Sequence, residues 1–161
     1  MPITPAITLR DYQPSDLAAV VALFKASVQG LAAAHYDAAQ CQAWAPEAAD
    51  LQAWQVRLAG LQVRVAQHWR QLAGFIGFTA DGHIDLLFSS PRYARQGVAA
   101  ALYRDAEACL QRLGIGSIFT EASLTARPFF ARQGFSVEQA QTVERGAVTL
   151  QRFAMRKPLR P

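Results

Sequence analysis

The sequence predicts an α+β fold, in which a mostly antiparallel β-sheet is combined with helices that pack around it. Three strand-like segments follow one another in the middle of the chain with no helical pattern between them, which indicates an antiparallel meander. Helical patterns lie on both sides of this meander, and further strand-like segments close the chain. With 161 residues and no repeat, linker or low-complexity tract, we expect one domain over residues 1–161.

The first 60 residues predict one short strand and three helices. The strand covers residues 7–10. Apolar residues at helical spacing then mark a helix that begins at Pro14 and ends near Gly30. Asp37 stands where its side chain can cap a short second helix. A third helical face follows and is stopped by Gly60.

The meander begins at Leu61, where the apolar period changes from helical to alternating. Its second and third strands are expected at residues 72–78 and 83–88. The pair Asp81-Gly82 predicts a hairpin turn between them, because glycine tolerates a positive φ angle.

The last part of the chain predicts two further helices among short strands. A long amphipathic helix covers Gln96–Leu113 and ends at Gly114, a residue type typical of helix C-termini. A second helix begins around Thr125, with Pro128 in its first turn, and is stopped by Gly134. The strands are expected at residues 117–122, 135–137 and 150–155.

The composition is that of a compact globular chain, since 52% of the residues are apolar and 17% are charged, which excludes a disordered or fibrous protein. Lys, Arg, Gln or Gly interrupt the apolar stretches before the ~20 residues that a bilayer crossing requires, so we expect no membrane partner. The first residues lack the basic flank and apolar run of a secretory signal, which favours a cytoplasmic location.

Two cysteines allow one disulfide, but free thiols are the expected state. Cys109 falls on the buried stripe of the long predicted helix, where cysteine behaves as a small apolar residue. His35, Cys41 and His68 do not have the spacing of metal ligands, so no metal site is expected.

A net charge of +4 and a pI near 9.5 are compatible with an acidic partner, either nucleic acid or a phosphorylated cofactor. The arginines are scattered along the chain and do not form one basic run with interleaved aromatics, so we do not expect nucleic acid to be the partner. The alternative is that most of them only form a solvated surface. Arg92 and Arg95 are the exception, because they lie together just before the long helix.

This segment, SPRYARQGVAAAL at residues 90–102, has the properties of a phosphate site. A strand ends, a tight loop follows, and a helix begins whose unpaired N–H groups and positive dipole end favour an anion. Gly97 and Ala99 are small and would let a phosphate approach the backbone. The candidate residues are Arg95, Gln96, Gly97, Val98, Ala99 and Ala100. The alternative is an ordinary helix start with a flexible glycine.

The loop resembles the coenzyme-binding loop of the GCN5-related N-acetyltransferases (GNAT), which reads Gln or Arg, two variable residues, Gly, one variable residue, then Gly or Ala. Ala94 departs from this pattern at its first position, and Arg95 beside it would supply the missing donor. A second block, EASLTARPFFARQGF at residues 121–135, resembles the strand–helix–strand region that follows in the family. The resemblance covers nearly the whole chain, with residues 31–60 the least similar part.

The resemblance implies a single N-acetyltransferase domain over residues 1–161, with a sheet of six to seven strands. The central strands at 84–88 and 117–122 would splay apart and leave a V-shaped slot for acetyl-CoA (coenzyme A). The enzyme would transfer the acyl group directly from the thioester to a primary amine of a small molecule or peptide. A homodimer is a frequent state of such folds.

Residues along the slot would then hold the coenzyme. Backbone groups of Leu87 and Ser89 would pair with the pantetheine amides, and an N–H near Leu87 or Phe88 would polarise the thioester carbonyl. Ser123 aligns with a family position that often carries Asn to bind pantetheine; its alternative role is in the turn that starts a helix. Phe130 would also lie against the coenzyme.

The attacking amine must be neutral, so either a base or a chain of water molecules is required to take up its proton. Asp85 is the first candidate, because it is a carboxylate inside an apolar strand where burial would raise its pKa toward neutrality, and we expect it to control the pH dependence. Glu121 is the second candidate. The alternative for each is a strand residue that faces solvent. His83 adjoins the hairpin turn, so we expect it to be exposed.

The residue that aligns with the family's acidic tyrosine is Phe130, which has no proton to give. Either Tyr36 serves as the acid, or the thiolate leaves without help. Because of Phe130 and Ala94, a non-catalytic module that binds or senses acyl-CoA is the alternative function.

The resemblance places residues 31–60 on the acceptor side of the slot. His35, Tyr36 and Trp44 are the candidate substrate-binding residues, with Trp54 nearby, because aromatic rings can enclose a cationic amine. Packing in the core is the alternative role for the tryptophans.

Overall fold

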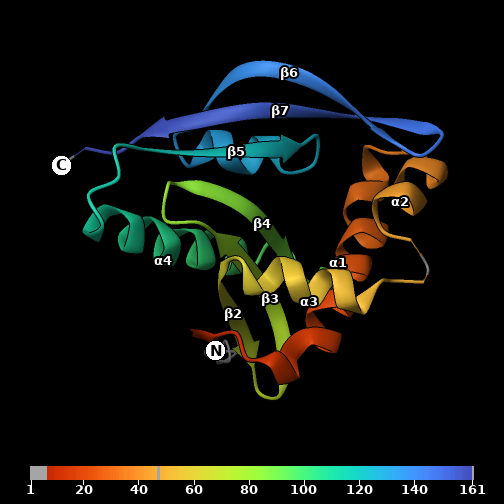
Figure 1. The fold of residues 1–161 in the computed structure, drawn as a ribbon, viewed down its shortest axis with the longest axis horizontal. Coiled ribbons are helices and arrows are strands. Elements are labelled where there is room, and N and C mark those ends of the chain that lie inside the picture. The colour runs from red at the N-terminus through yellow and green to blue at the C-terminus, as the bar shows by residue number, and fades with distance from the viewer. Residues whose placement is uncertain (1–6, 47, 161) are drawn as a thin grey trace, which may run out of the picture.

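The computed structural model describes residues 7–46 and 48–160. At its centre is a seven-stranded sheet in the order β1-β2-β3-β4-β5-β7-β6 (Figure 1). All neighbouring strands are antiparallel except β4 and β5, which run parallel. The mostly antiparallel sheet predicted from the sequence is therefore confirmed. The strands are β1 (Thr8–Asp11), β2 (Gln62–His68), β3 (Gln71–Phe78), β4 (His83–Ser89), β5 (Ser117–Ser123), β6 (Ser136–Arg145) and β7 (Val148–Pro158).

Five α-helices surround the sheet, and they begin and end close to the predicted positions. They are α1 (Leu17–Gly30), α2 (Ala38–Trp44), α3 (Leu51–Ala59), α4 (Val98–Arg112) and α5 (Arg127–Arg132). Asp37 caps α2 as expected, by accepting a hydrogen bond from the backbone N–H of Gln40 at 2.8 Å. Gly114 follows α4 with a φ angle of 76°, the left-handed conformation that favours glycine at this position.

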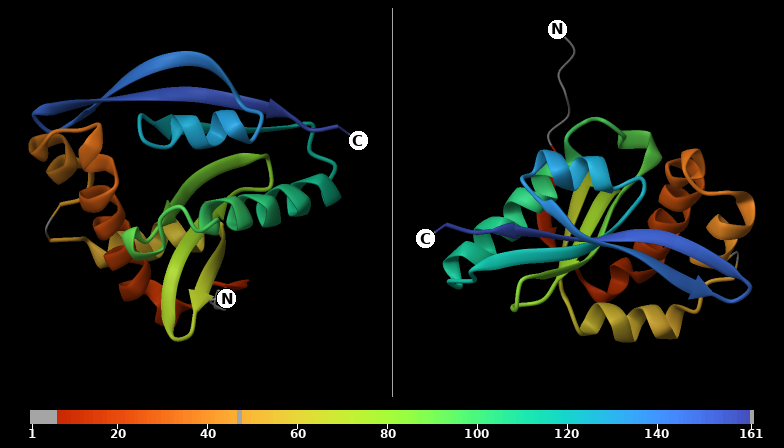
Figure 2. Two further views of the ribbon diagram at one scale, coloured as in Figure 1. Left: turned by 180° about the vertical axis from the view of Figure 1, so that it is seen from behind. Right: turned by 90° about the horizontal axis from the view of Figure 1, so that it is seen from above.

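The helices divide between the two faces of the sheet. Figure 2 shows α1 and α4 on opposite sides of the central strands, and both helices contact β3 and β4. One core forms between the sheet and α4 with α5, and a second core forms between the sheet and α1, α2 and α3. The second core contains most of the aromatic residues that precede residue 60 in the chain.

The segment Pro14–Ala34, which contains α1, has the length and composition of a membrane-crossing helix, with a mean hydropathy of 1.7. Its apolar side is nevertheless buried inside the protein: Val20 and Val28 are almost fully inaccessible and belong to the core beneath the sheet. This packing accounts for the apolar character of the helix.

The β6–β7 hairpin is much longer than the sequence predicted. The two strands pair from Ser136 with Arg156 to Arg145 with Val148, with one register shift between Val137 and Gln139 and a turn at Gly146. We expected strands at 135–137 and 150–155 only. Most of β6 is exposed because it is the edge strand of the sheet. An edge strand that buries little apolar surface shows no alternation in the sequence, so the periodicity criterion misses it.

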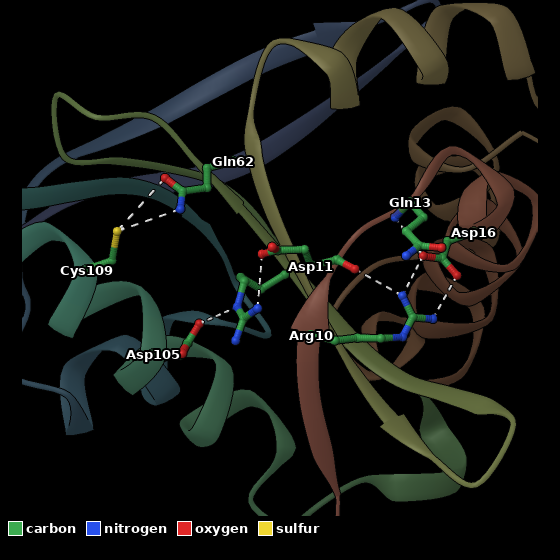
Figure 3. Close-up of polar contacts among 8 residues, drawn as sticks. Arg10, Asp11, Gln13, Asp16, Gln62, Asp105 and Cys109 are labelled. Atoms are coloured by element: carbon green, nitrogen blue, oxygen red, sulfur yellow. Dashed lines mark hydrogen bonds and ion pairs between the residues drawn. The ribbon is translucent and has the colours of Figure 1, made fainter.

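The cysteines are both free, as predicted, but Cys109 is less buried than its place on the helical stripe predicted. Cys41 is buried, while Cys109 is only half-buried. The Cys109 sulfur lies 3.8 Å from the Gln62 amide nitrogen, at the edge of the stripe that α4 presents to the sheet (Figure 3).

Ion pairs between charged residues connect the first strand to the rest of the molecule (Figure 3). Arg64 on β2 donates from Nε to Asp105 on α4 at 2.9 Å and from Nη1 to Asp11 on β1 at 3.0 Å. Arg10 donates to both carboxylate oxygens of Asp16, at 2.8 and 2.9 Å, and the Gln13 backbone N–H donates to the same carboxylate. The Arg10 hydrogen bond holds the pKa of Asp16 below its usual value.

This lowered pKa makes the contribution of Asp16 to stability dependent on pH. The contribution is complete above the pKa of the unfolded chain and is lost as the pH falls through the folded-state value. We expect Asp16→Asn to lower the free energy of unfolding by about 1–2 kcal/mol at pH 7, and the difference from the parent to disappear at acidic pH. Urea denaturation at both pH values measures this. Asp37→Asn is the matched control and should cost little, since Asn caps a helix as well as Asp does.

Candidate active site

The central strands part in the middle of the sheet. β4 and β5 pair at only two positions, His83 with Phe119 and Ile84 with Thr120. The Thr120 hydroxyl donates to the Ile84 carbonyl at 2.9 Å, at the last paired position. Beyond this position β4 and β5 do not pair with each other, and Figure 1 shows β4 diverging from β5. This is the V-shaped slot that the resemblance implied.

A β-bulge lies on β4 at the point where the slot opens. Gly77 pairs with Leu86 and Phe78 with Ile84, which leaves Asp85 between them without a partner on β3. The Ile84 carbonyl accepts from Thr120 on the β5 side, whereas the Ser90 N–H donates to Ala73 on the β3 side. Backbone groups alternate in direction along a strand, so those of Leu87 and Ser89 are directed into the slot.

A cavity of about 470 Å³ lies at the closed end of the slot. Its wall on one side comes from α1, α3 and the segment between α2 and α3, and on the other from β4, β5 and the β6–β7 hairpin. It includes three of the predicted catalytic residues, Asp85, Glu121 and Tyr36, together with Trp44, Leu87, Phe88, Ser123 and Phe130. Ser89, the last residue of β4, and the loop at 95–100 that follows this strand do not line the cavity.

The loop before α4 has the geometry of an anion site. Arg95 and Gly97 have φ angles of 62° and 81°, and the first backbone bond of the helix runs from the Ala101 N–H to the Gly97 carbonyl. In the part of the chain that the structure describes, the N–H groups of Val98, Ala99 and Ala100 have no backbone acceptor. A Cβ atom added at Gly97 would meet nothing within 4 Å, so the space in front of the loop is open to a phosphate.

Asp85 does not have the desolvated environment that we predicted. Its side chain is 27% exposed, and Arg57 on α3 donates to both of its oxygens, at 3.1 and 3.2 Å. Arg57 also lies over the ring of Trp54, at 5.5 Å from its centroid. The sequence could not show this pair, because the two residues are 28 positions apart. An oxygen already held by a guanidinium is poorly placed to accept a proton from a substrate.

Glu121 is paired with a residue that we expected to be exposed and uninvolved. His83 Nε2 lies 2.9 and 3.1 Å from the two oxygens of Glu121, and both residues line the cavity. The His83 ring stacks on Phe119 with 4.8 Å between centroids, and its side chain is 24% exposed. The expectation that His83 is exposed is therefore wrong, because the pairing of β4 with β5 places its ring against Phe119 on the neighbouring strand.

Tyr36 reaches the cavity from the segment between α1 and α2, but its hydroxyl is fully engaged. It donates to the Gln151 carbonyl at 2.7 Å and accepts from the Leu124 N–H at 2.9 Å. Burial raises the pKa of Tyr36, and the Leu124 hydrogen bond opposes this only in part. These contacts connect Tyr36 to the residue after β5 and to the first part of β7, and they direct the hydroxyl proton to the Gln151 carbonyl.

Ser123 and Phe130 both line the cavity but are also used by the fold. The Ser123 hydroxyl accepts from the Ala126 N–H at 3.0 Å, so it closes the turn that starts α5, the alternative that the sequence left open. Phe130 is almost completely buried and packs edge-on against Tyr103 and Phe135. No proton donor stands at its position.

Aromatic side chains form one wall of the cavity. The ring of Phe24 lies 4.8 Å from that of Trp54 and 5.0 Å from that of Phe88, and Tyr36 lies 5.5 Å from Trp44, measured between centroids. These residues pack in the core and line the cavity at the same time. His35 is not among them: it is exposed and its Nδ1 lies 3.1 Å from the Thr125 hydroxyl.

Comparison with known proteins places this architecture in one family. The family model of the GNAT acetyltransferase domain matches residues 32–157. The chain belongs to the GNAT acetyltransferase family. The N-acetyltransferase YafP of Escherichia coli (strain K12) is 38% identical over 150 residues, which are 93% of this chain and 95% of that protein. The family model thus includes residues 32–60, which lie in the part that the sequence alone had left as the least similar.

Solved structures agree with this assignment. A GCN5-related N-acetyltransferase from Rhodopseudomonas palustris has a TM-score of 0.90 and 33% identity, covering 97% of this chain and 96% of its own. The PaiA N-acetyltransferase from Thermoplasma acidophilum, solved in complex with coenzyme A, has a TM-score of 0.77 and 20% identity, with 96% and 99% covered. The predicted family, fold and enzyme class are confirmed, and since GNAT domains use acetyl-CoA, the predicted coenzyme is confirmed with them.

Proposed function

We propose that this single-domain enzyme transfers an acetyl group directly from acetyl-CoA to a primary amine of a small molecule or peptide, with the chemistry at the closed end of the slot between β4 and β5. One observation carries the proposal. The slot presents free backbone groups of a strand at one edge, and it ends in a cavity that contains carboxylates. Acetyl-CoA supplies a thioester whose carbonyl carbon can accept an amine.

The residues that would hold the coenzyme fit its chemistry. The loop before α4 offers N–H groups, the positive end of a helix dipole and the Arg95 side chain to a pyrophosphate. The edge of β4 at Leu87 and Ser89 offers the hydrogen bonds that an extended amide chain needs, as a partner strand would. The proposed coenzyme residues are Leu87, Phe88, Ser89, Arg95, Gln96, Gly97, Val98, Ala99, Ala100, Ser123 and Phe130.

Glu121 is the proposed proton acceptor for the attacking amine. Its carboxylate lines the cavity and is oriented by His83, whose stacking on Phe119 fixes the ring. Asp85 lies in the same cavity, but the guanidinium of Arg57 occupies both of its oxygens. His83 is thus a positioning residue, and Asp85 is the second candidate.

In this proposal, no side chain of the protein donates a proton to the departing thiolate. Phe130 cannot donate a proton, and the Tyr36 proton is held by the Gln151 carbonyl. A thiol is a far stronger acid than an alcohol, with a pKa near 8.5, so its anion is a competent leaving group. A cytoplasmic location and a homodimer complete the proposal, and both rest on the sequence arguments above.

Turnover of acetyl-CoA with a panel of primary amines tests the function. We expect release of free coenzyme A thiol that depends on the amine, together with a mass spectrum of the acetylated product. Tight binding of acetyl-CoA without turnover of any amine would favour the non-catalytic module for binding or sensing acyl-CoA.

A further inference from the structure

Arg152 stands out among the cations of the cavity. It is half-buried on β7, and its Nε donates to the Gln141 side-chain oxygen at 2.9 Å. Over residues 7–46 and 48–160, no acceptor is recorded for its two terminal nitrogens, and no carboxylate pairs with it. The guanidinium is therefore held in place by a neutral amide while its two outer donors stay available.

The position of Arg152 in the sheet places it on the acceptor side. Arg152 pairs with Ser123 on β5, and along β7 it alternates in step with Leu150, which is buried in the core beneath α1 and α2. Arg152 thus lies on that face, opposite α4 and α5. The proposed coenzyme loop belongs to the α4 side.

Glu121 lies diagonally across from Arg152 on the same face, two residues before Ser123. Diagonal neighbours of this kind are about 7–8 Å apart at their Cα atoms, so the two side chains can contact the same small molecule. The wall between them and the helices is apolar and aromatic, from Phe24, Trp44 and Leu150. The cavity is bipolar, with a carboxylate at one pole and a guanidinium at the other.

Several other charged groups that line the cavity are engaged or lie at its margin. Arg57 is paired with Asp85, and Asp50 caps α3 by accepting from the Ala53 N–H at 3.0 Å. Arg145, at the end of β6, is exposed at the rim and alternates in step with Gln141, on the face that bears Arg152. It adds positive potential at the same pole.

From this arrangement we infer that the acceptor is an amine that also carries a carboxylate, on an apolar or aromatic body. The carboxylate binds the planar fork of Arg152, a geometry suited to two parallel hydrogen bonds. The amino group then points toward Glu121, and the apolar body packs on the aromatic wall. This inference rests on the proposed function, because it names the class of amine that the same site accepts.

Matched acceptor pairs test the inference. L-Phenylalanine is compared with L-phenylalaninamide, and para-aminomethylbenzoate with its amide, in the parent protein, in Arg152→Gln and in the control Arg112→Gln. Arg112 is exposed in the last turn of α4 and lies outside the cavity. We expect the parent to prefer the acids, and Arg152→Gln to lower kcat/KM for the acids by about 10- to 100-fold, as losing a charged hydrogen-bond pair does.

The amides should change by less than about threefold in Arg152→Gln, and Arg112→Gln should retain the parent's preference. Acid-to-amide ratios that are equal in the parent and in Arg152→Gln would overturn the inference while leaving the acetyltransferase function intact. If no compound is turned over, binding of the same pairs to the protein saturated with coenzyme A is measured through Trp44 and Trp54 fluorescence. Preferential binding of the acids that Arg152→Gln removes supports the inference, and its absence overturns it.

Discussion

A Gly97→Glu variant is expected to lose measurable binding of acetyl-CoA. The Gly97 backbone has a φ angle of 81° and forms the start of α4, where N–H groups without backbone acceptors face open space. A glutamate there fills the space with a side chain and adds a negative charge against the phosphates. Both effects act on the anion site that we propose. Titration calorimetry with acetyl-CoA measures the loss.

The opposite end of the same helix supplies a matched control. Gly114 also has a positive φ angle, 76°, and a Cβ atom added there would likewise meet nothing within 4 Å. Gly114→Glu therefore carries a similar backbone penalty, of order 1–2 kcal/mol, without touching the proposed site. We expect Gly114→Glu to bind acetyl-CoA as the parent does. Undiminished affinity in a folded Gly97→Glu protein would contradict the assignment of the loop.

The features that the sequence predicted well are those that a local sequence pattern determines. The period of α1 and α4, the Asp37 cap and the glycine at the end of α4 each depend on neighbouring residues, and the structure confirms them. The local structure of the proposed coenzyme loop was also predictable, because a strand end, a glycine and a helix start are adjacent in the chain.

The features that the sequence could not show depend on pairing across strands. The bulge that leaves Asp85 unpaired follows from the register between β3 and β4, which no local pattern fixes. The pairing of His83 with Glu121 joins residues 38 positions apart, and that of Arg57 with Asp85 joins a helix to a strand. A charged residue in an apolar strand was a correct signal for the cavity. The environment of Asp85 is determined by a partner elsewhere in the chain, Arg57.

Glu121→Gln is expected to lower kcat/KM by about 10²- to 10⁴-fold, the usual range for the loss of a general base. The glutamine keeps the size of the side chain but cannot take the proton of the acceptor amine. The increase of the rate with pH on the acidic side of the profile should therefore disappear as well. Acetyl-CoA binding should be unchanged, because the carboxylate lies on the acceptor side of the slot. Steady-state rates across pH, with calorimetry for binding, measure both.

Asp85→Asn is the matched comparison, since it removes a carboxylate from the same cavity while leaving His83 and Glu121 in place. We expect a loss of less than about tenfold and an unchanged pH profile, because Arg57 rather than a substrate occupies those oxygens. His83→Phe retains a ring against Phe119 but removes the bond to Glu121, so it should reduce the rate by about 10- to 100-fold. If Asp85→Asn instead flattened the acidic limb while Glu121→Gln kept the parent's rate, the base would be Asp85, and the Arg57 pair would have to open when the acceptor binds.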